Sequence, residues 1–236
     1  RGRRGRTKSQ DDFVRQYFAH VPPRDMREDD AANLAGAAMD HLEFAATRKP
    51  KRSKVRVFNP RREVDGWYSD HTVVEVVTDD MPFLVDTVSA ALIREQLVVF
   101  LVIHPIVPVK RDGAGRLKDV AAAAAPEGRN ESFMLFEVSH ISGARLGAVR
   151  AAVESVLADV RVAVDDWQPM RNALGDIIGE FDTPPATPTI EDTLESQAFL
   201  KWLYDDNFMF LGFRDYDFIA KGKDAAFRVR RGKGMG

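Results

Sequence analysis

The residues with the clearest chemical potential are five that follow a valine-rich run, Asp79-Asp80-Met81-Pro82-Phe83. They precede a pattern typical of a helix, and the free N–H groups at a helix N-terminus bind carboxylates and other anions. The carboxylates of Asp79 and Asp80 could in turn hold an ammonium group. This combination suits an amino acid, so we predict an effector site at residues 79–83. A tight turn in which the aspartates cap the helix and no ligand binds is the simpler alternative.

The sequence lacks the other familiar motifs of catalysis. Its five histidines are scattered without the spacing of a metal site, and it has no cysteine to supply a thiolate. It contains no nucleophile elbow, phosphate loop or dinucleotide-binding fingerprint. The acidic pair Asp165-Asp166 is predicted to cap a helix, and the glycine-rich segment 232–236 is predicted to be a loop. We therefore predict no catalytic, cofactor-binding or metal-ligating residue.

Basic residues gather in two places, although the formal net charge is only −2. One cluster lies within residues 1–8 and the other within residues 48–62. Contact with nucleic acid or other phosphate groups is one interpretation. Because no nucleic-acid-binding motif accompanies the charge, we favour a flexible basic arm and a solvated or subunit-facing linker.

Composition places the chain among ordinary globular proteins. Of its 236 residues, 44% are hydrophobic and 30% are charged. No apolar run approaches the ~20 residues that cross a bilayer, and no signal-peptide pattern opens the sequence. The expected location is the cytoplasm, without a membrane partner.

The candidate site is positioned by a predicted strand–turn–helix–strand unit over residues 71–109. The β-branched run 73–77 predicts a buried strand. Apolar residues then recur at helical spacing after Phe83. The apolar run 98–109 is predicted to return as one strand.

Further elements are predicted on both sides of this unit. Asp11-Asp12 is expected to cap a short helix, and a second helix is expected over about 28–47. Residues 55–58 alternate between apolar and charged, which predicts a short strand. Residues 131–139 contain few polar side chains, so this strand is expected to be covered on both faces.

Residues 143–181 leave two interpretations open. Their apolar stripe fits a long helix, whereas 160–164 also alternates like a strand and Pro169 would kink a continuous helix. We favour the helix. In that case strand 55–58 can occupy the sheet edge that 160–164 would otherwise take.

The proline-rich segment 184–188 predicts a linker. A helix is expected over about 189–204, followed by a strand at 207–218 and a return strand at 227–231. These elements are expected to be the start of a second module. The chain is accordingly expected to be a piece of a longer protein.

The order of these elements is similar to that of an ACT domain, a small βαββαβ regulatory module that often binds amino acids. The segment 79–86 resembles the acidic, proline-bearing first loop of that module. One departure concerns Phe83, which stands where ACT loops usually carry a glycine. Ligand binding therefore depends on this residue.

Several segments together resemble the N-terminal region of the large bacterial NAD-specific glutamate dehydrogenases, from about residue 11 to residue 236. They are VRVFNP (55–60), DDMPFLVD (79–86), IHPIV (103–107), ESFMLFEV (131–138), LADVRVAVDDWQPM (157–170) and FLKWLYDDNFMFLGFRDYDF (199–218). In that family, ACT-like modules precede a remote catalytic domain that converts L-glutamate, NAD⁺ and water to 2-oxoglutarate, ammonium and NADH. No substrate lysine or dinucleotide fingerprint of that domain can be carried onto this sequence.

The resemblance implies a non-catalytic regulatory or oligomerisation fragment, with NAD in the parent enzyme and no cofactor in this fragment. The implied partners are its own catalytic domain, the subunits of a homo-oligomer and an amino-acid effector. Two alternatives stay open: a purely structural assembly module without ligand and, less favoured, a nucleic-acid contact through the basic N-terminal arm.

The predicted fold class is α+β: an ACT-like (ferredoxin-like) antiparallel sheet with helices on one face, N-terminal helices and the start of a second α+β module. The expected divisions are a basic arm with N-terminal helices at 1–54, a first ACT-like module with a long C-terminal helix at 55–183, a linker at 184–188 and a second module at 189–236.

Overall fold

The computed structural model describes residues 7–26, 30–121, 129–181, 190–221 and 224–236. The chain divides into two compact units, Arg1–Ala158 and Asp159–Gly236. The predicted basic arm at residues 1–6 and the linker at 184–188 lie outside the described residues. The first unit contains both the predicted N-terminal helices and the predicted ACT-like sheet.

An antiparallel sheet of six strands forms the centre of the first unit. Five of them follow the order β1-β2-β6-β4-β5, and β3 pairs with β6 beside β4. Their bounds are β1 Lys54–Phe58, β2 Thr72–Asp79, β3 Val99–Ile103, β4 Ile106–Arg111, β5 Leu117–Val120 and β6 Arg129–Val138.

The single strand predicted over 98–109 is in fact two strands, so this prediction is wrong. Strands β3 and β4 follow one another along the same edge of the ten-residue β6 and are separated by His104-Pro105. Pro105 has no N–H to donate to a ladder, and its carbonyl accepts a hydrogen bond from the Phe133 N–H at 3.0 Å. The break redirects the chain into the β4–β5 hairpin, an addition to the βαββαβ pattern.

The sheet has an ACT-like arrangement. β2, α4 (Leu84–Arg94), β3, β6 and α5 (Ala144–Glu180) supply the first five elements of that pattern in order. The sixth element of the pattern is a strand beside the first one. Here β1, which precedes β2 in the chain, occupies that position and pairs with β2 antiparallel. The predicted α+β class and the edge position of strand 55–58 are both confirmed. Residues 160–164 are helical, within α5.

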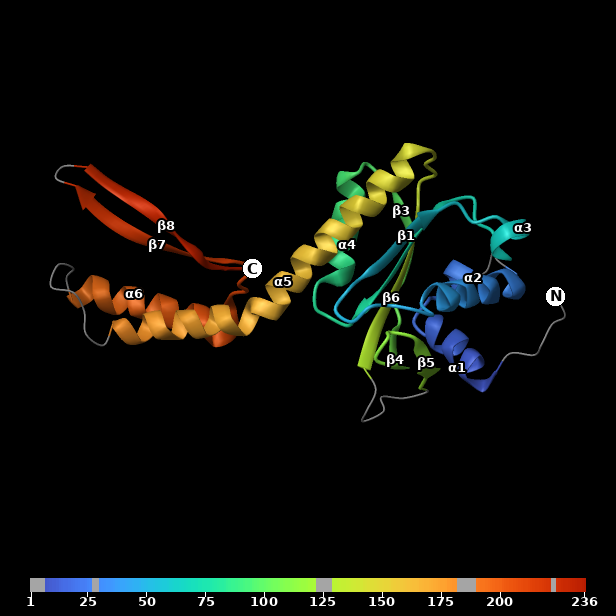
Figure 1. Ribbon diagram of the computed structural model, residues 1–236, viewed down its shortest axis with the longest axis horizontal. Coiled ribbons are helices and arrows are strands. Elements are labelled where there is room, and N and C mark those ends of the chain that lie inside the picture. The colour runs from blue at the N-terminus through green and yellow to red at the C-terminus, as the bar shows by residue number, and fades with distance from the viewer. Residues whose placement is uncertain (1–6, 27–29, 122–128, 182–189, 222–223) are drawn as a thin grey trace. The chain divides into compact units, whose positions relative to one another are not determined.

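Helices cover both faces of the sheet. On one face, α1 (Lys8–Tyr17) and α2 (Ala31–Phe44) pack against alternate strand residues such as Val73 and Phe133. The intervening residues of β2 and β6 are buried on the opposite face, which α4 and the first part of α5 cover (Figure 1). Both faces of β6 are therefore covered, as the sequence predicts. Two short helices complete the unit, the 3₁₀ turn Pro23–Met26 and α3 Arg62–Asp65.

The N-terminal helix starts earlier than predicted because a capping box precedes it. The Thr7 hydroxyl accepts from the Gln10 N–H at 3.3 Å, and the Gln10 side chain accepts from the Thr7 N–H at 2.8 Å. Asp11 and Asp12 lie inside the helix and are not its caps. The reciprocal pair satisfies two N–H groups that the helix end leaves free.

The second unit contains the C-terminal part of α5, helix α6 (Ile190–Trp202), a π turn at Leu203–Asn207 and the hairpin of β7 (Phe213–Lys221) and β8 (Asp224–Met235). The strand predicted over 207–218 begins only at Phe213 because the π turn precedes it. Residues 232–235, predicted to be a loop, belong to β8 since Phe213 pairs with Met235.

Helix α5 continues through Asp165-Asp166 and contains Pro169. The prediction that this acidic pair caps a helix is therefore wrong. One oxygen of Asp166 instead accepts from the Gly236 N–H at 2.9 Å. An acidic pair shortly before a proline thus marks no helix end here.

Candidate functional site

The predicted effector segment connects β2 to α4, but its aspartates do not cap the helix. Phe83 occupies the N-cap position of α4 and makes no side-chain capping hydrogen bond. Its backbone is left-handed, with φ 68° and ψ 2°, a conformation that favours glycine. The structure therefore supplies a physical reason for the glycine that ACT loops usually carry here.

The two aspartates turn toward neighbouring strands. The Asp79 Oδ1 atom lies 2.6 Å from Arg48 Nη2. The Asp80 Oδ1 atom accepts from the Ser132 hydroxyl at 3.1 Å, and that hydroxyl lies 3.1 Å from His104 Nε2. Burial lowers the pKa of His104, with Asp80 opposing the shift. Met81, Pro82 and Phe83 stay near the surface of the turn, so the structure does not bring the five residues together around one centre.

Asp79 belongs to a buried ionic cluster that sequence inspection misses. Asp79 and Glu131 lie directly opposite each other on β2 and β6, where two like charges would repel. Arg48 Nη2 bridges them, at 2.6 Å from Asp79 and 2.7 Å from Glu131. Arg111 donates to both Glu131 oxygens, from Nε to Oε1 at 2.6 Å and from Nη2 to Oε2 at 2.8 Å. We call Arg48, Asp79, Arg111 and Glu131 the ionic wall.

Two members of the ionic wall are almost entirely removed from water, whereas the side chains of Arg111 and Asp79 are 11% and 24% exposed. Arg48 and Glu131 are 5% and 1% exposed. Burial alone would lower the pKa of Arg48, but Glu131 and Asp79 outweigh it and raise that pKa. Arg48 therefore remains a charged guanidinium inside the protein. The sequence predicts a solvated or subunit-facing linker at this position, whereas Arg48 is buried within the fold.

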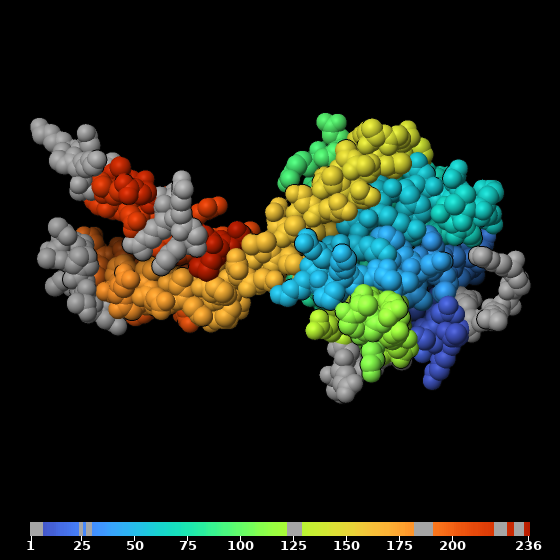
Figure 2. All heavy atoms as spheres, in the orientation of Figure 1, coloured from blue at the N-terminus to red at the C-terminus, as the bar shows by residue number. Residues whose placement is uncertain are grey.

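The β4–β5 hairpin fixes the ionic wall against the segment that connects α2 to β1. The Gly115 carbonyl accepts from the Arg48 N–H at 3.0 Å and from Arg111 Nη1 at 2.9 Å. Gly115 has φ +78°, and a Cβ there would lie 2.1 Å from the Arg48 carbonyl oxygen. Only glycine fits this close approach. Figure 2 shows the two segments side by side on the surface.

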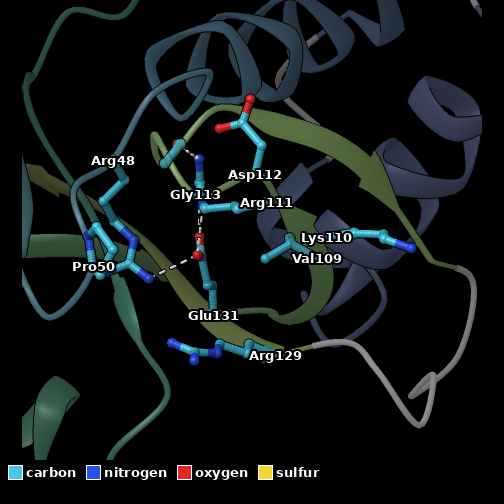
Figure 3. Close-up of a pocket in the computed structure, with 10 residues that line it drawn as sticks. Arg48, Pro50, Val109, Lys110, Arg111, Asp112, Gly113, Arg129 and Glu131 are labelled. Atoms are coloured by element: carbon cyan, nitrogen blue, oxygen red, sulfur yellow. Dashed lines mark hydrogen bonds and ion pairs between the residues drawn. The ribbon is translucent and has the colours of Figure 1, made fainter.

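A cavity of about 300 Å³ opens against the ionic wall. Arg48, Arg111 and Glu131 line it together with Pro50, Gly113 and Arg129. In Figure 3 the guanidinium groups of Arg48, Arg111 and Arg129 gather around Glu131, whereas the Lys110 amine points away from it. The arrangement can bind an anion through guanidinium groups.

A second cluster of acidic and basic side chains, centred on the buried Glu75, lies between β2 and α2. Glu75 and Arg56 are direct cross-strand partners, with Arg56 Nε 2.7 Å from Glu75 Oε2. Arg56 Nη2 also lies 2.6 Å from an oxygen of Asp40, which accepts from Trp67 Nε1 at 2.9 Å. Arg56 thus joins the sheet to α2. Like Arg48, it comes from the cluster predicted to be a solvated linker and is paired inside the fold.

Among the described residues, no group of three histidine or carboxylate side chains is arranged to hold a metal ion. No described helix combines the length and apolar character needed to span a membrane.

The antiparallel strand order and the left-handed turn at the start of α4 define the class of this protein as an ACT-like α+β domain. Comparison with known families is more specific. Residues 13–153 match the family described as glutamate dehydrogenase, ACT1 domain, and the chain belongs to this family. The matched residues lie within the first compact unit.

Two curated relatives show the same relationship. The chain is 39% identical over 212 residues to a NAD-specific glutamate dehydrogenase from Halomonas elongata and 29% identical over 208 residues to one from Pseudomonas aeruginosa. These alignments cover 88% and 86% of this chain but only 13% of each relative. The chain therefore spans a small part of the length of the enzymes it matches.

Replacing Phe83 with glycine is expected to give a more stable protein than replacing it with alanine, by about 1 kcal/mol. Both substitutions remove the same ring, which is 37% exposed, but only glycine relieves the left-handed backbone. Urea unfolding of the two variants measures the difference. Equal stabilities would show that the left-handed conformation carries no cost at this position.

Proposed function

We propose that this chain is a non-catalytic regulatory and oligomerisation segment of a NAD-dependent glutamate dehydrogenase. In the proposed parent reaction, L-glutamate, NAD⁺ and water yield 2-oxoglutarate, ammonium and NADH. The observation that carries the proposal is the match to the ACT1 family over residues 13–153, together with the ACT-like sheet of the first unit. The proposed partners are the catalytic domain of the parent enzyme and further subunits, in the cytoplasm.

The β2–α4 turn is a poor fit for NAD, which supports placing cofactor binding elsewhere in the parent enzyme. A dinucleotide pyrophosphate binds where a glycine-rich loop leads from a strand to a helix N-terminus. Between β2 and α4 the chain instead has two carboxylates and a phenylalanine at the N-cap position. The carboxylates would repel a pyrophosphate, and the Phe83 side chain occupies the position that a glycine would leave open.

As an effector module, the segment would bind an amino acid at residues 79–83 and shift the enzyme between states of different activity. The exposure of Asp80 and Pro82 in this turn supports the role, whereas the Phe83 side chain occupies the space that a glycine would leave for a ligand. Calorimetry of the chain with a panel of amino acids tests it. We expect saturable heat for at least one of them and a change in its affinity when Phe83 becomes glycine. If no amino acid of the panel gives binding heat, only the assembly role is left.

The assembly role alone has its own support. Val98, just before β3, and Phe100 and Val102 on it are 58%, 56% and 37% exposed, and exposed apolar strands are typical of protein–protein contacts. Light scattering on purified chain distinguishes the two roles. Self-association that disappears in a Phe100→Lys variant would favour assembly, whereas a monomer at all concentrations would count against it.

The nucleic-acid alternative concerns the basic N-terminal arm, of which residues 1–6 lie outside the described residues. In the second basic cluster, Arg48 and Arg56 are paired with carboxylates. Guanidinium groups paired in this way are not available to phosphates.

A further inference from the structure

The cavity beside the ionic wall has more positive than negative charge around it. Glu131 is shared by Arg48 and Arg111, and Asp79 is paired with Arg48. Arg129 adds a third guanidinium to the lining, below Glu131 in Figure 3, and pairs with no carboxylate among the described residues. Two carboxylates thus face three guanidinium groups, which leaves one positive charge for a ligand to balance.

The acidic residue at the rim of the cavity does not cancel this excess. Asp112 lines the cavity, but its oxygens accept from the Ala114 and Arg116 N–H groups at 3.0 and 2.9 Å. The Arg116 and Lys118 side chains also lie 2.9 and 3.3 Å from it. The backbone hydrogen bond from Arg116 is the largest contribution to the lowered pKa of Asp112. The Asp112 carboxylate is therefore bonded to groups of the β4–β5 hairpin and does not neutralise the arginines of the cavity.

The cavity is also preformed by packing that does not depend on a ligand. Gly115 holds the hairpin on Arg48, and the ionic wall fixes both arginines in one orientation. Its volume of about 300 Å³ is at the lower end of the range for small-molecule sites. Pro50 and Val109 add apolar walls. Arg48 and Arg111 are held in place, whereas Arg129 is exposed, and guanidinium groups favour a planar or tetrahedral oxyanion.

We propose that this cavity binds a small oxyanion, a carboxylate or a phosphate, with Arg129 as its principal contact and Arg111 and Arg48 as its charged wall. None of residues 79–83 lines the cavity, although Asp79 reaches its charged wall through the contact with Arg48. It lies on the β4–β5 hairpin that the βαββαβ pattern lacks. The inference goes beyond the proposed function and would hold for a module with no regulatory role.

The test is calorimetry of the whole chain at constant ionic strength, titrated separately with glutarate and with sodium phosphate. We expect saturable binding of at least one of them, weakened about tenfold or more in Arg129→Met, since one hydrogen bond to a charged group is lost. Arg94→Met is the matched control, because it removes an exposed arginine that does not line the cavity. Circular dichroism of each variant verifies that it is folded.

The two titrations identify the ligand chemistry. Binding of glutarate alone assigns the site to carboxylates, and binding of phosphate alone assigns it to phosphates. The proposal is overturned if neither anion binds, if Arg129→Met binds like the parent chain, or if Arg94→Met loses as much affinity as Arg129→Met. None of these results depends on whether an amino acid binds at residues 79–83.

Discussion

Replacing Glu131 with alanine is expected to destabilise the first unit by about 3–5 kcal/mol. Glu131 is 1% exposed and receives hydrogen bonds from both Arg48 and Arg111. Its loss leaves Arg111 without a carboxylate partner and Arg48 with only Asp79. Breaking one partner out of a buried ion pair costs far more than removing an exposed pair, because the remaining charge stays buried.

Urea unfolding followed by Trp67 fluorescence measures this loss, since Trp67 is 2% exposed and lies in the first unit. Trp167→Phe and Trp202→Phe remove the two emitters of the second unit. Glu154→Gln is the control: Glu154 lies on α5 in a solvent-exposed pair with Arg150 at 3.6 Å, and its loss is expected to cost less than about 1 kcal/mol. A Glu131→Ala variant as stable as this control would contradict the ionic wall.

Replacing Glu75 with glutamine is expected to abolish a loss of stability that the parent protein shows as the pH rises toward 8. Glu75 is fully buried, and burial raises its pKa from 4.5 to about 8, with Arg56 opposing the shift. The folded state therefore keeps a proton that the unfolded state releases above pH 4.5. The stability contributed by the protonated form is complete below pH 4.5 and is lost as the pH rises to about 8, on the order of 4 kcal/mol in all.

His41, whose pKa is lowered by burial and also by the Arg56 charge, acts in the opposite direction. Burial lowers its pKa from 6.5 to about 3, and its Nδ1 atom lies 2.7 Å from the Tyr17 hydroxyl. The unfolded state then binds the extra proton, so stability is lost as the pH falls from 6.5 toward 3. The contributions of Glu75 and His41 cancel between pH 4.5 and 6.5, which predicts a plateau there and a decline above it.

Urea unfolding at several pH values separates the two groups. Glu75→Gln should remain flat from pH 6.5 to 8 while the parent protein loses stability, and the exposed-pair variant Glu154→Gln should follow the parent. Parallel profiles for the parent and Glu75→Gln would show that Glu75 keeps the same charge in the folded and unfolded states.

Local sequence patterns predict several of the main helices and strands of this fold but not its charge clusters. The valine run of β2, the apolar helix after Phe83 and the long stripe of α5 each follow from the side-chain period. The break at His104-Pro105 is harder to anticipate because apolar residues continue on both sides of it. The Thr7–Gln10 capping box is visible in the sequence, and it determines the helix start in place of the acidic pair that follows it.

The ionic wall could not be predicted because its members come from four separate segments. Arg48 meets Glu131 across 83 positions of the sequence, and no local period reports such a contact. A weaker signal does exist. Glu75 and Glu131 are carboxylates within or beside apolar strands that are covered on both faces, and a buried carboxylate requires a cationic partner. The second basic cluster supplies both partners, Arg48 and Arg56.

The most direct test of the proposed non-catalytic role is an assay of NADH formation by the purified, folded chain with L-glutamate and NAD⁺. A full-length NAD-specific glutamate dehydrogenase serves as the positive control, and unfolding with Trp67 fluorescence verifies that the chain is folded. We expect no NADH above the protein-free background at any concentration of the chain. NADH formation that requires glutamate and rises in proportion to the chain would contradict the non-catalytic role.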